Sequence, residues 1–226
     1  MAGAPRSLGI LGGTFNPPHL GHLEVARHAR EELGLDQVLL VPAHTAPYKA
    51  GGEQRAGARD PGPQQRLRMC ELAVAGEDGL GVCAIEIERG GLSYTVDTLE
   101  SIHASHPQAE LTFIVGADTA STLRSWRQPQ RLLELAKLAV AARAGAAQQR
   151  VLAALAAIPA TGAEHGPQGP GAPARVSFLE MPAISVSSSM ARERVARGEA
   201  IDQLVGPAVA DYIAAHGLYA GAVASR

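Results

Sequence analysis

The chain has 226 residues, a length that fits one α/β domain with or without a small appendage. Apolar residues make up 46% and charged residues 19%, and the formal net charge is -2, so nothing in the composition suggests a nucleic-acid partner. Two cysteines, Cys70 and Cys83, are too few for a disulfide framework, and no run reaches the roughly 18 apolar residues of a membrane helix. We therefore expect a cytoplasmic protein that binds neither nucleic acid nor membranes, and the sequence leaves open whether it forms a homo-oligomer.

The first fifth of the chain predicts a β-α-β unit. Leu8 to Leu11 is a short apolar run that ends at a pair of glycines, which is typical of a buried strand. Apolar residues then recur at helical spacing from Leu20 to Leu33, with Pro18 near the start and Gly34 at the end. Val38 to Val41 predicts a second strand, so the unit favours a parallel sheet with a right-handed crossover.

The rest of the chain continues this alternation. Helices are expected at 65–74, 95–105, 131–135, 146–158, 189–196 and 207–215, and strands at 80–88, 111–115, 137–142 and 176–181. Segments rich in Gly and Pro, at 50–64 and 161–174, are expected to be loops. The order predicts a Rossmann-like three-layer α/β/α fold with a mostly parallel sheet. We expect a single domain over 1–226, with its core at about 7–185 and a C-terminal helical segment at about 186–220.

The segment from Gly12 to His22 reads GGTFNPPHLGH, and it joins the first expected strand to the first expected helix. Ligands of doubly wound sheets bind at the carboxyl ends of the strands, and paired glycines let the backbone approach a ligand closely. Free N–H groups at the start of a helix favour a phosphate. The segment matches neither GxGxxG nor GxxxxGK[ST], which argues against the nicotinamide-dehydrogenase and P-loop fingerprints.

His19 and His22 are three residues apart at the start of this helix, so their side chains are expected to share a face. Both imidazoles are then predicted to point at the anion that the helix end favours. One alternative is a pair of unrelated surface histidines. Another is a metal pair with His44 as a third ligand, but no Cys or carboxylate at fixed spacing completes a zinc set.

A second motif, ISVSSSMARER, runs from Ile184 to Arg194. Its serines stand where a helix should begin, and serine is a strong N-cap residue. The free N–H groups behind them can bind phosphate oxygens, and Arg192, one turn further on, offers bidentate contacts to the same phosphate. The alternative is simple helix capping beside a solvated arginine. Two such helix starts together predict a clamp for a triphosphate.

These two segments resemble the nucleotidyltransferase superfamily with H-x-G-H and I-S-S-x-x-x-R signatures. Within it, the chain is most similar to the bacterial nicotinate-nucleotide adenylyltransferases. The similarity also runs through Gln65-Arg66-Leu67, Ser93-Tyr94-Thr95, Ile114-Val115-Gly116-Ala117-Asp118, Trp126 and His216-Gly217-Leu218-Tyr219. These middle segments matter most, because the two phosphate signatures alone mark only the superfamily.

The resemblance implies transfer of AMP from ATP to nicotinate mononucleotide, and it assigns roles to residues. The charge on the phosphates would be offset by His19, His22, Lys49 and Arg192. ATP would be held by Gly12, Gly13, Thr14, Phe15, Asp118, Ser187, Ser188 and Ser189, with Asp118 at the adenosine end. Nicotinate mononucleotide would be held by Tyr94, Thr95, Trp126 and Arg127, with Trp126 stacked on the pyridine ring. Mg²⁺ would bridge the ATP phosphates, bound mostly by their oxygens and by water, without protein ligands of its own.

The chain departs from the family pattern at four places. Asn16 stands where aspartate is commoner, Tyr48 replaces a histidine before Lys49, and Ser189 replaces a threonine. Arg127 follows Trp126, where it either pairs with the nicotinate carboxylate or points to solvent.

Three alternative functions stay open at this point. The acceptor could be phosphopantetheine, FMN or nicotinamide mononucleotide, although Tyr94, Thr95, Asp118 and Trp126 together favour a pyridine nucleotide. The chain could be a fragment of a class I aminoacyl-tRNA synthetase, but it lacks the KMSKS motif. It could also be a nucleotide-binding module without catalytic activity, against which the presence of both histidines and Arg192 argues.

Overall fold

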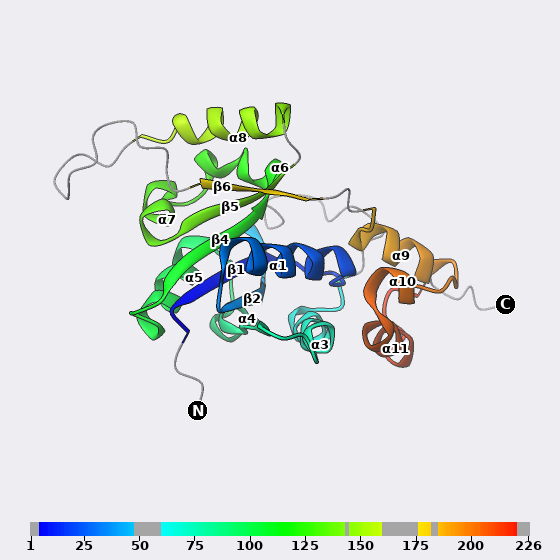
Figure 1. Cartoon of the computed structure of the whole chain (residues 1–226). Helices are drawn as coiled ribbons and strands as arrows, with labels where there is room; N and C mark the ends of the chain where they lie inside the picture. The colour runs from blue at the N-terminus through cyan, green and yellow to red at the C-terminus, as the bar shows by residue number, and fades with distance from the viewer. Residues whose placement is uncertain (1–4, 48–59, 143–144, 160–175, 182–184, 221–226) are drawn as a thin grey trace.

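The structure, a computed structural model, describes residues 5–47, 60–142, 145–159, 176–181 and 185–220. Lys49 and Tyr48 lie outside the described residues, and so does the expected loop at 161–174. Helices cover both faces of a central sheet, and a group of helices near the C-terminus lies to one side of it (Figure 1).

The described residues form a six-stranded sheet in which every pair of neighbouring strands is parallel. The strands are β1 (Ser7–Gly13), β2 (Gln37–Pro42), β3 (Leu80–Val82), β4 (Glu110–Gly116), β5 (Lys137–Ala142) and β6 (Val176–Glu180). Their order is β3-β2-β1-β4-β5-β6, the Rossmann-like arrangement that the sequence predicts. The strand order reverses between β1 and β4, so the ligand crevice of such a sheet is expected at the carboxyl ends of these two strands.

The helices of the described residues confirm most of the expected elements. They are α1 (Leu20–Leu33), α3 (Pro63–Val74), α4 (Ile85–Arg89), α5 (Thr95–Ser105), α6 (Ala117–Ala120), the 3₁₀ turn η1 (Leu123–Ser125), α7 (Pro129–Leu135), α8 (Ala146–Ala156), α9 (Ser188–Ala196), α10 (Asp202–Val205) and α11 (Pro207–Ala215). The short elements α6, η1 and α10 have no counterpart among the expected ones, because four residues or fewer show no helical period.

The expected strand at 80–88 is wrong in its second half. β3 ends at Val82, and α4 begins at Ile85. The alternation of apolar and acidic residues suggested a strand, yet the adjacent residues Glu86 and Ile87 are both buried. The Glu86 carboxylate accepts a hydrogen bond of 2.6 Å from the Thr98 hydroxyl on α5, so a contact with another element stabilises the helix. Such a contact overrides the local alternation of a five-residue segment.

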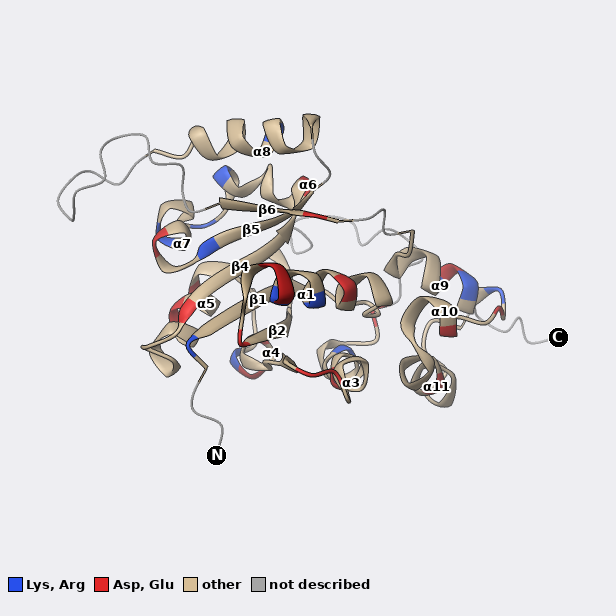
Figure 2. Cartoon of the chain, in the orientation of Figure 1, with Lys and Arg blue, Asp and Glu red and all other residues tan. Residues whose placement is uncertain are grey.

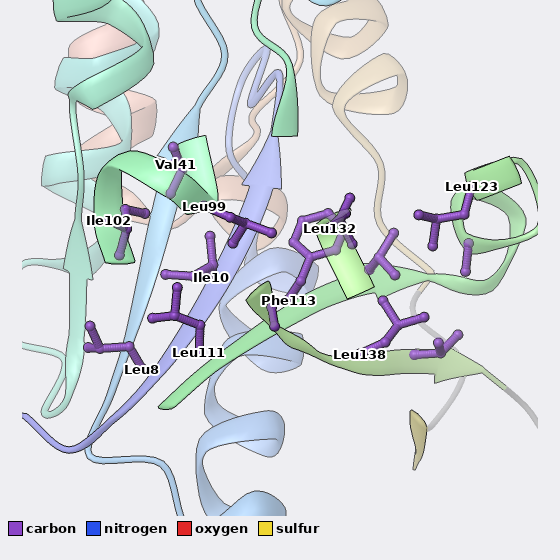
Figure 3. Packing of buried hydrophobic residues seen from close by; sticks show 14 of the residues in the cluster. Leu8, Ile10, Val41, Leu99, Ile102, Leu111, Phe113, Leu123, Leu132 and Leu138 are labelled. Atoms are coloured by element: carbon purple, nitrogen blue, oxygen red, sulfur yellow. The ribbon is translucent and has the colours of Figure 1, made fainter. Parts of the chain in front are cut away.

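The hydrophobic core has a layer on each face of the sheet. On one face, side chains from β1, β4 and β5 pack against α5 and α7 (Figure 3); they include Leu8, Ile10, Leu111, Phe113, Leu138, Leu99, Ile102 and Leu132. On the other face α1 and α3 cover the sheet, through residues that include Leu23, Ala26, Ala29, Leu40, Cys70 and Ile114. Because both faces are covered, the strands are continuous apolar runs.

A third cluster attaches the C-terminal helices to the rest of the chain. Met69 of α3 packs with Ala191 of α9 and with Leu204, Val209 and Ile213 from α10 and α11. Basic and acidic residues are interspersed on α9 (Figure 2), which includes the sequence Arg192-Glu193-Arg194. The cluster fixes the start of α9 relative to α3, which matters for the site described next.

Candidate active site

Glycines leave open space at the point where the strand order reverses. A Cβ atom on Gly12 would meet only the edge of the Phe113 ring, at 3.6 Å, and one on Gly116 would meet no atom within 4 Å. Gly9, further down β1, differs, because its Cβ would lie 2.8 to 2.9 Å from side chains of three neighbouring residues. Gly9 is therefore needed for packing, whereas Gly12 and Gly116 leave the strand ends accessible to a ligand.

The two histidines of the first motif lie together at the start of α1. His19 is the N-cap residue, with extended backbone, and His22 is the third residue of the helix. Their rings stack with centroids 3.6 Å apart, and the Phe15 ring meets His22 edge-on at 4.8 Å. The backbone N–H of His19 donates to Nδ1 of His22 at 3.1 Å. Since Nδ1 of His22 accepts this bond, its proton is on Nε2, which is a donor.

The protonation of this pair changes the role that the sequence suggested. Burial lowers the pKa of His19 to about 4. Burial and the neighbouring His19 lower the pKa of His22 to about 3. Both imidazoles are therefore neutral at pH 7 in the ligand-free protein. They therefore offer N–H donors, and not positive charges, to an anion.

This neutral pair predicts that the ligand-free protein loses stability in mild acid. In the unfolded chain a histidine takes up a proton near pH 6.5, whereas the folded pair resists protonation down to about pH 4 and pH 3. The unfolded state thus binds more protons, so the free energy of unfolding falls as the pH drops below 6.5. For His22 we expect the free energy of unfolding to fall by about 1–2 kcal/mol when the pH drops from 7 to 5. Urea unfolding of wild type and His22→Gln at both pH values measures this loss of stability. If both proteins lose the same free energy of unfolding between pH 7 and pH 5, the prediction is wrong.

The second motif packs directly on the first. The Ser187 side chain caps α9 by accepting from the Met190 N–H at 3.2 Å. The Ser188 hydroxyl donates to the carbonyl oxygen of Pro17 at 2.7 Å, and Arg192 donates to that of Asn16 at 2.6 Å. The start of α9 is thereby fastened to the loop that precedes α1. The alternative of a merely solvated arginine is wrong for Arg192, which also donates to Ser189 Oγ at 3.0 Å.

Asn16 takes part in a buried contact that its sequence position did not reveal. Its side-chain oxygen accepts a hydrogen bond of 2.6 Å from the Tyr219 hydroxyl, and both residues are under a tenth exposed. Burial raises the pKa of Tyr219, so the phenol remains a neutral donor. The neutral amide of Asn16 suits this site, because a carboxylate there would have to be desolvated. Tyr219 is a residue that the sequence analysis mentioned without a role.

The four residues predicted to bind the nicotinate lie around the start of α5 and the end of η1. Thr95 is the first residue of α5, Tyr94 precedes it, and the Arg127 guanidinium lies 4.7 Å from the centre of the Tyr94 ring. Arg127 also donates to Asp97 at 3.1 Å. The Arg127 side chain is thus about half exposed, and in the ligand-free protein its guanidinium contacts the Asp97 carboxylate and the Tyr94 ring.

Trp126 follows η1 and is partly exposed, as the sequence predicted. Its ring packs edge-on against Phe113, with centroids 6.0 Å apart, and its Nε1 donates to the Thr122 hydroxyl at 3.1 Å. Asp118 lies just beyond the end of β4, where its exposed carboxylate is 3.8 Å from Arg150. Trp126 thus packs one edge of its ring against the core. Asp118 lies at the carboxyl end of β4, where the strand order reverses.

Arg66 has no predicted role in the sequence, yet the structure places it against the strand ends. Its side chain is fully buried, and it donates hydrogen bonds to backbone carbonyls at the ends of β1 and β2. The helical spacing of Arg66 relative to the apolar residues of α3 could have indicated that its side chain is buried. Arg66 shares the buried face of α3 with Met69 and Cys70, three and four residues on, so helical periodicity places a cation among apolar side chains.

Two further observations concern metals and membranes. Among the residues that the structure describes, no three His, Cys, Asp or Glu side chains gather into a metal-binding group. None of the helices within the described ranges is long and apolar enough to span a membrane.

The parallel sheet with this strand order, and two helix starts joined at the end of β1, define a Rossmann-like α/β fold with a candidate nucleotide site. The family model "Cytidylyltransferase-like" matches residues 10–194. A probable nicotinate-nucleotide adenylyltransferase of Roseiflexus sp. is 41% identical over 97% of this chain and 100% of its own length. One of Geobacillus thermodenitrificans is 37% identical over 94% of this chain and 85% of its own. The chain belongs to the nicotinate-nucleotide adenylyltransferase family.

Solved structures share the fold at low sequence identity. Nicotinic acid mononucleotide adenylyltransferase of Plasmodium falciparum, in complex with NaAD, is 17% identical, with a TM-score of 0.67 over 95% of this chain and 97% of that one. A protein of Vibrio parahaemolyticus, named "Putative Nicotinate-nucleotide Adenylyltransferase", is 18% identical, with a TM-score of 0.61 over 95% of each chain. The architecture therefore persists where most side chains differ.

Proposed function

We propose that this chain transfers AMP from ATP to nicotinate mononucleotide, with nicotinate adenine dinucleotide and pyrophosphate as products. One observation carries the proposal: the starts of α1 and α9 are joined at the carboxyl end of β1 by the bonds of Ser188 and Arg192 to the Asn16–Pro17 backbone. Two helix starts aimed at one place suit a polyphosphate. Membership of the family supports the choice of substrates.

The reaction needs little covalent chemistry from the protein. A phosphate oxygen of the mononucleotide attacks the α-phosphorus of ATP, a new P–O bond forms, and the bond to the β-phosphate breaks as pyrophosphate leaves. The nucleophile is already an anion at neutral pH, so a general base is unnecessary. Catalysis then comes from positioning the two substrates and from stabilising charge on the phosphates. His19, His22, Lys49 and Arg192 would do this, the histidines as neutral N–H donors.

The ATP side of the proposed site follows from the strand end and the two helix starts. The phosphates would be contacted by backbone N–H groups at the end of β1 and in the loop after it (Gly12, Gly13, Thr14 and Phe15) and by the side chains of Ser187, Ser188 and Ser189. Asp118 would lie near the adenosine. Arg192 uses two of its donors on protein oxygens, and a guanidinium has five, so others can contact a phosphate.

The nicotinate side would use Tyr94, Thr95, Trp126 and Arg127. The exposed part of the Trp126 ring offers a stacking surface for the flat pyridine. Thr95 is the first residue of a helix, and its N–H group has no partner within that helix, which suits a carboxylate. Arg127 would reach the same carboxylate while it keeps its contact with the Tyr94 ring.

Mg²⁺ is proposed as the cofactor, held by phosphate oxygens and water. Mg²⁺ usually keeps several waters and binds through substrate phosphates, so ATP itself would carry the ion. When bound, the ion would neutralise part of the charge on the phosphates.

The experiment is pyrophosphate release from ATP and Mg²⁺ with nicotinate mononucleotide, nicotinamide mononucleotide or phosphopantetheine as acceptor. We expect kcat/KM for nicotinate mononucleotide to exceed the others by at least about tenfold, the effect of one well-placed charged contact. Release with a different acceptor would keep the chemistry and contradict the nicotinate assignment. ATP binding without release in any of the three reactions would instead indicate a regulatory nucleotide-binding module.

A further inference from the structure

Arg66 lies beneath the carboxyl ends of β1 and β2, on the buried face of α3. Its NH1 group donates to the carbonyl oxygens of Thr14 at 2.8 Å and Ala43 at 2.6 Å, and its NH2 group donates to that of His44 at 2.9 Å. Its Nε donates to the Asp60 carboxylate at 3.0 Å. One guanidinium thus makes four hydrogen bonds, three of them to backbone oxygens.

These three carbonyls belong to two different strand-end loops. Thr14 lies in the loop after β1, which is the proposed ATP side. Ala43 and His44 follow β2, and the His44 N–H donates to the Ser93 hydroxyl at 2.9 Å. The Ser93 N–H in turn donates to the carbonyl of the residue after His44, at 2.9 Å. Ser93 directly precedes Tyr94, so this path connects Arg66 with the proposed nicotinate side.

The geometry requires arginine at this position. Its planar guanidinium presents donors in several fixed directions, whereas the three N–H groups of lysine radiate from a single atom. A buried cation is costly unless its hydrogen bonds are satisfied. Here the carboxylate partner is about one third exposed, and the other three bonds go to backbone carbonyls. The charge therefore holds strand-end backbone in place, which sets the positions of both loops.

We infer that Arg66 is a positioning residue for the proposed reaction, because it holds the loops of the ATP side and the nicotinate side at a fixed separation. This inference rests on the proposed function. Arg66 does not touch the substrates itself. Its loss would let the two loops shift independently and so spoil the alignment of the attacking phosphate with the α-phosphorus of ATP.

The test compares Arg66→Lys and Arg66→Gln with wild type at saturating concentrations of both substrates. We expect kcat to fall by at least about tenfold in both variants, since a small misplacement of reacting groups is costly. The KM values should change less than kcat. The matched control is Arg27→Lys, because Arg27 also makes a two-bond contact, with Glu77 at 2.8 and 2.6 Å, but further along α1. Its kcat should equal that of wild type.

An unchanged kcat accompanied by a lower melting temperature would overturn the inference and leave Arg66 a structural residue. Should neither variant fold, Asp60→Ala decides, because it removes the partner of Arg66 Nε and leaves the three bonds to the backbone carbonyls in place. The change also removes the acceptor of the Gly62 N–H, so the melting temperature of this variant is measured as well. We then expect kcat to fall by at least about threefold, the low end of the value of one hydrogen bond, and an unchanged kcat would overturn the inference. Wild-type turnover is measured first. If wild type makes no product, the proposed function fails together with this inference, whereas active wild type with unaffected variants overturns this inference alone.

Discussion

Replacement of His22 by alanine is expected to lower kcat by about 10²-fold or more, the range for loss of one donor that acts on developing charge. Nε2 of His22 is the donor at the start of α1, because Nδ1 already accepts from the His19 N–H. The ring is also fixed by its stack on His19 and its edge contact with Phe15. The measurement is steady-state pyrophosphate release at saturating ATP and nicotinate mononucleotide.

His28→Ala is the matched control for this variant, since His28 is on the same helix and pairs with Glu32 at 2.8 Å. Its kcat should stay within about twofold of wild type, as expected for a partly buried position further along α1. The melting temperature of His22→Ala must be measured as well, because the change also removes the bond to the His19 N–H. A folded His22→Ala with nearly unchanged kcat would remove His22 from the mechanism.

Replacement of Arg192 by alanine is expected to lower kcat/KM by about 10²–10³-fold. Two effects combine in this variant. It removes a cation that the proposed mechanism directs at the phosphates, and it breaks the bond of 2.6 Å that fastens α9 to the Asn16 carbonyl. Arg192→Lys should recover only part of the loss, because an ammonium group does not reproduce the paired N–H donors of a guanidinium.

Arg194→Ala is the control, because Arg194 lies on the same helix and its nearest carboxylate, that of Glu199, is 3.8 Å away. Its kcat/KM should match that of wild type. Isothermal titration with ATP separates the two effects, since the loss of a phosphate contact weakens ATP binding even where α9 stays in place. Equal activity of Arg192→Ala and Arg194→Ala would contradict the role of Arg192.

The sequence predicted the fold well wherever hydrophobic periodicity, or a Gly, Pro or Ser at the end of an element, indicates secondary structure locally. Apolar runs gave the strands of the sheet, and helical spacing gave α5 and α11 with their observed bounds. Both phosphate motifs were located at helix starts because serine, proline and paired glycines favour such positions whatever surrounds them. Local patterns failed for α4, which a contact between Glu86 and Thr98 stabilises as a helix.

The sequence by itself therefore determined the order of the strands and the longer helices, the Rossmann-like class and the residues at the two helix starts. Only the tertiary structure decided how these residues meet. It paired Asn16 with Tyr219, 203 positions away, and it placed the Arg66 cation beneath two loops. It also made His19 and His22 neutral, because desolvation depends on what covers a ring and not on its neighbours along the chain. Periodicity and capping are properties of a few consecutive residues, whereas burial, charge state and long-range hydrogen bonds exist only once distant segments are packed together.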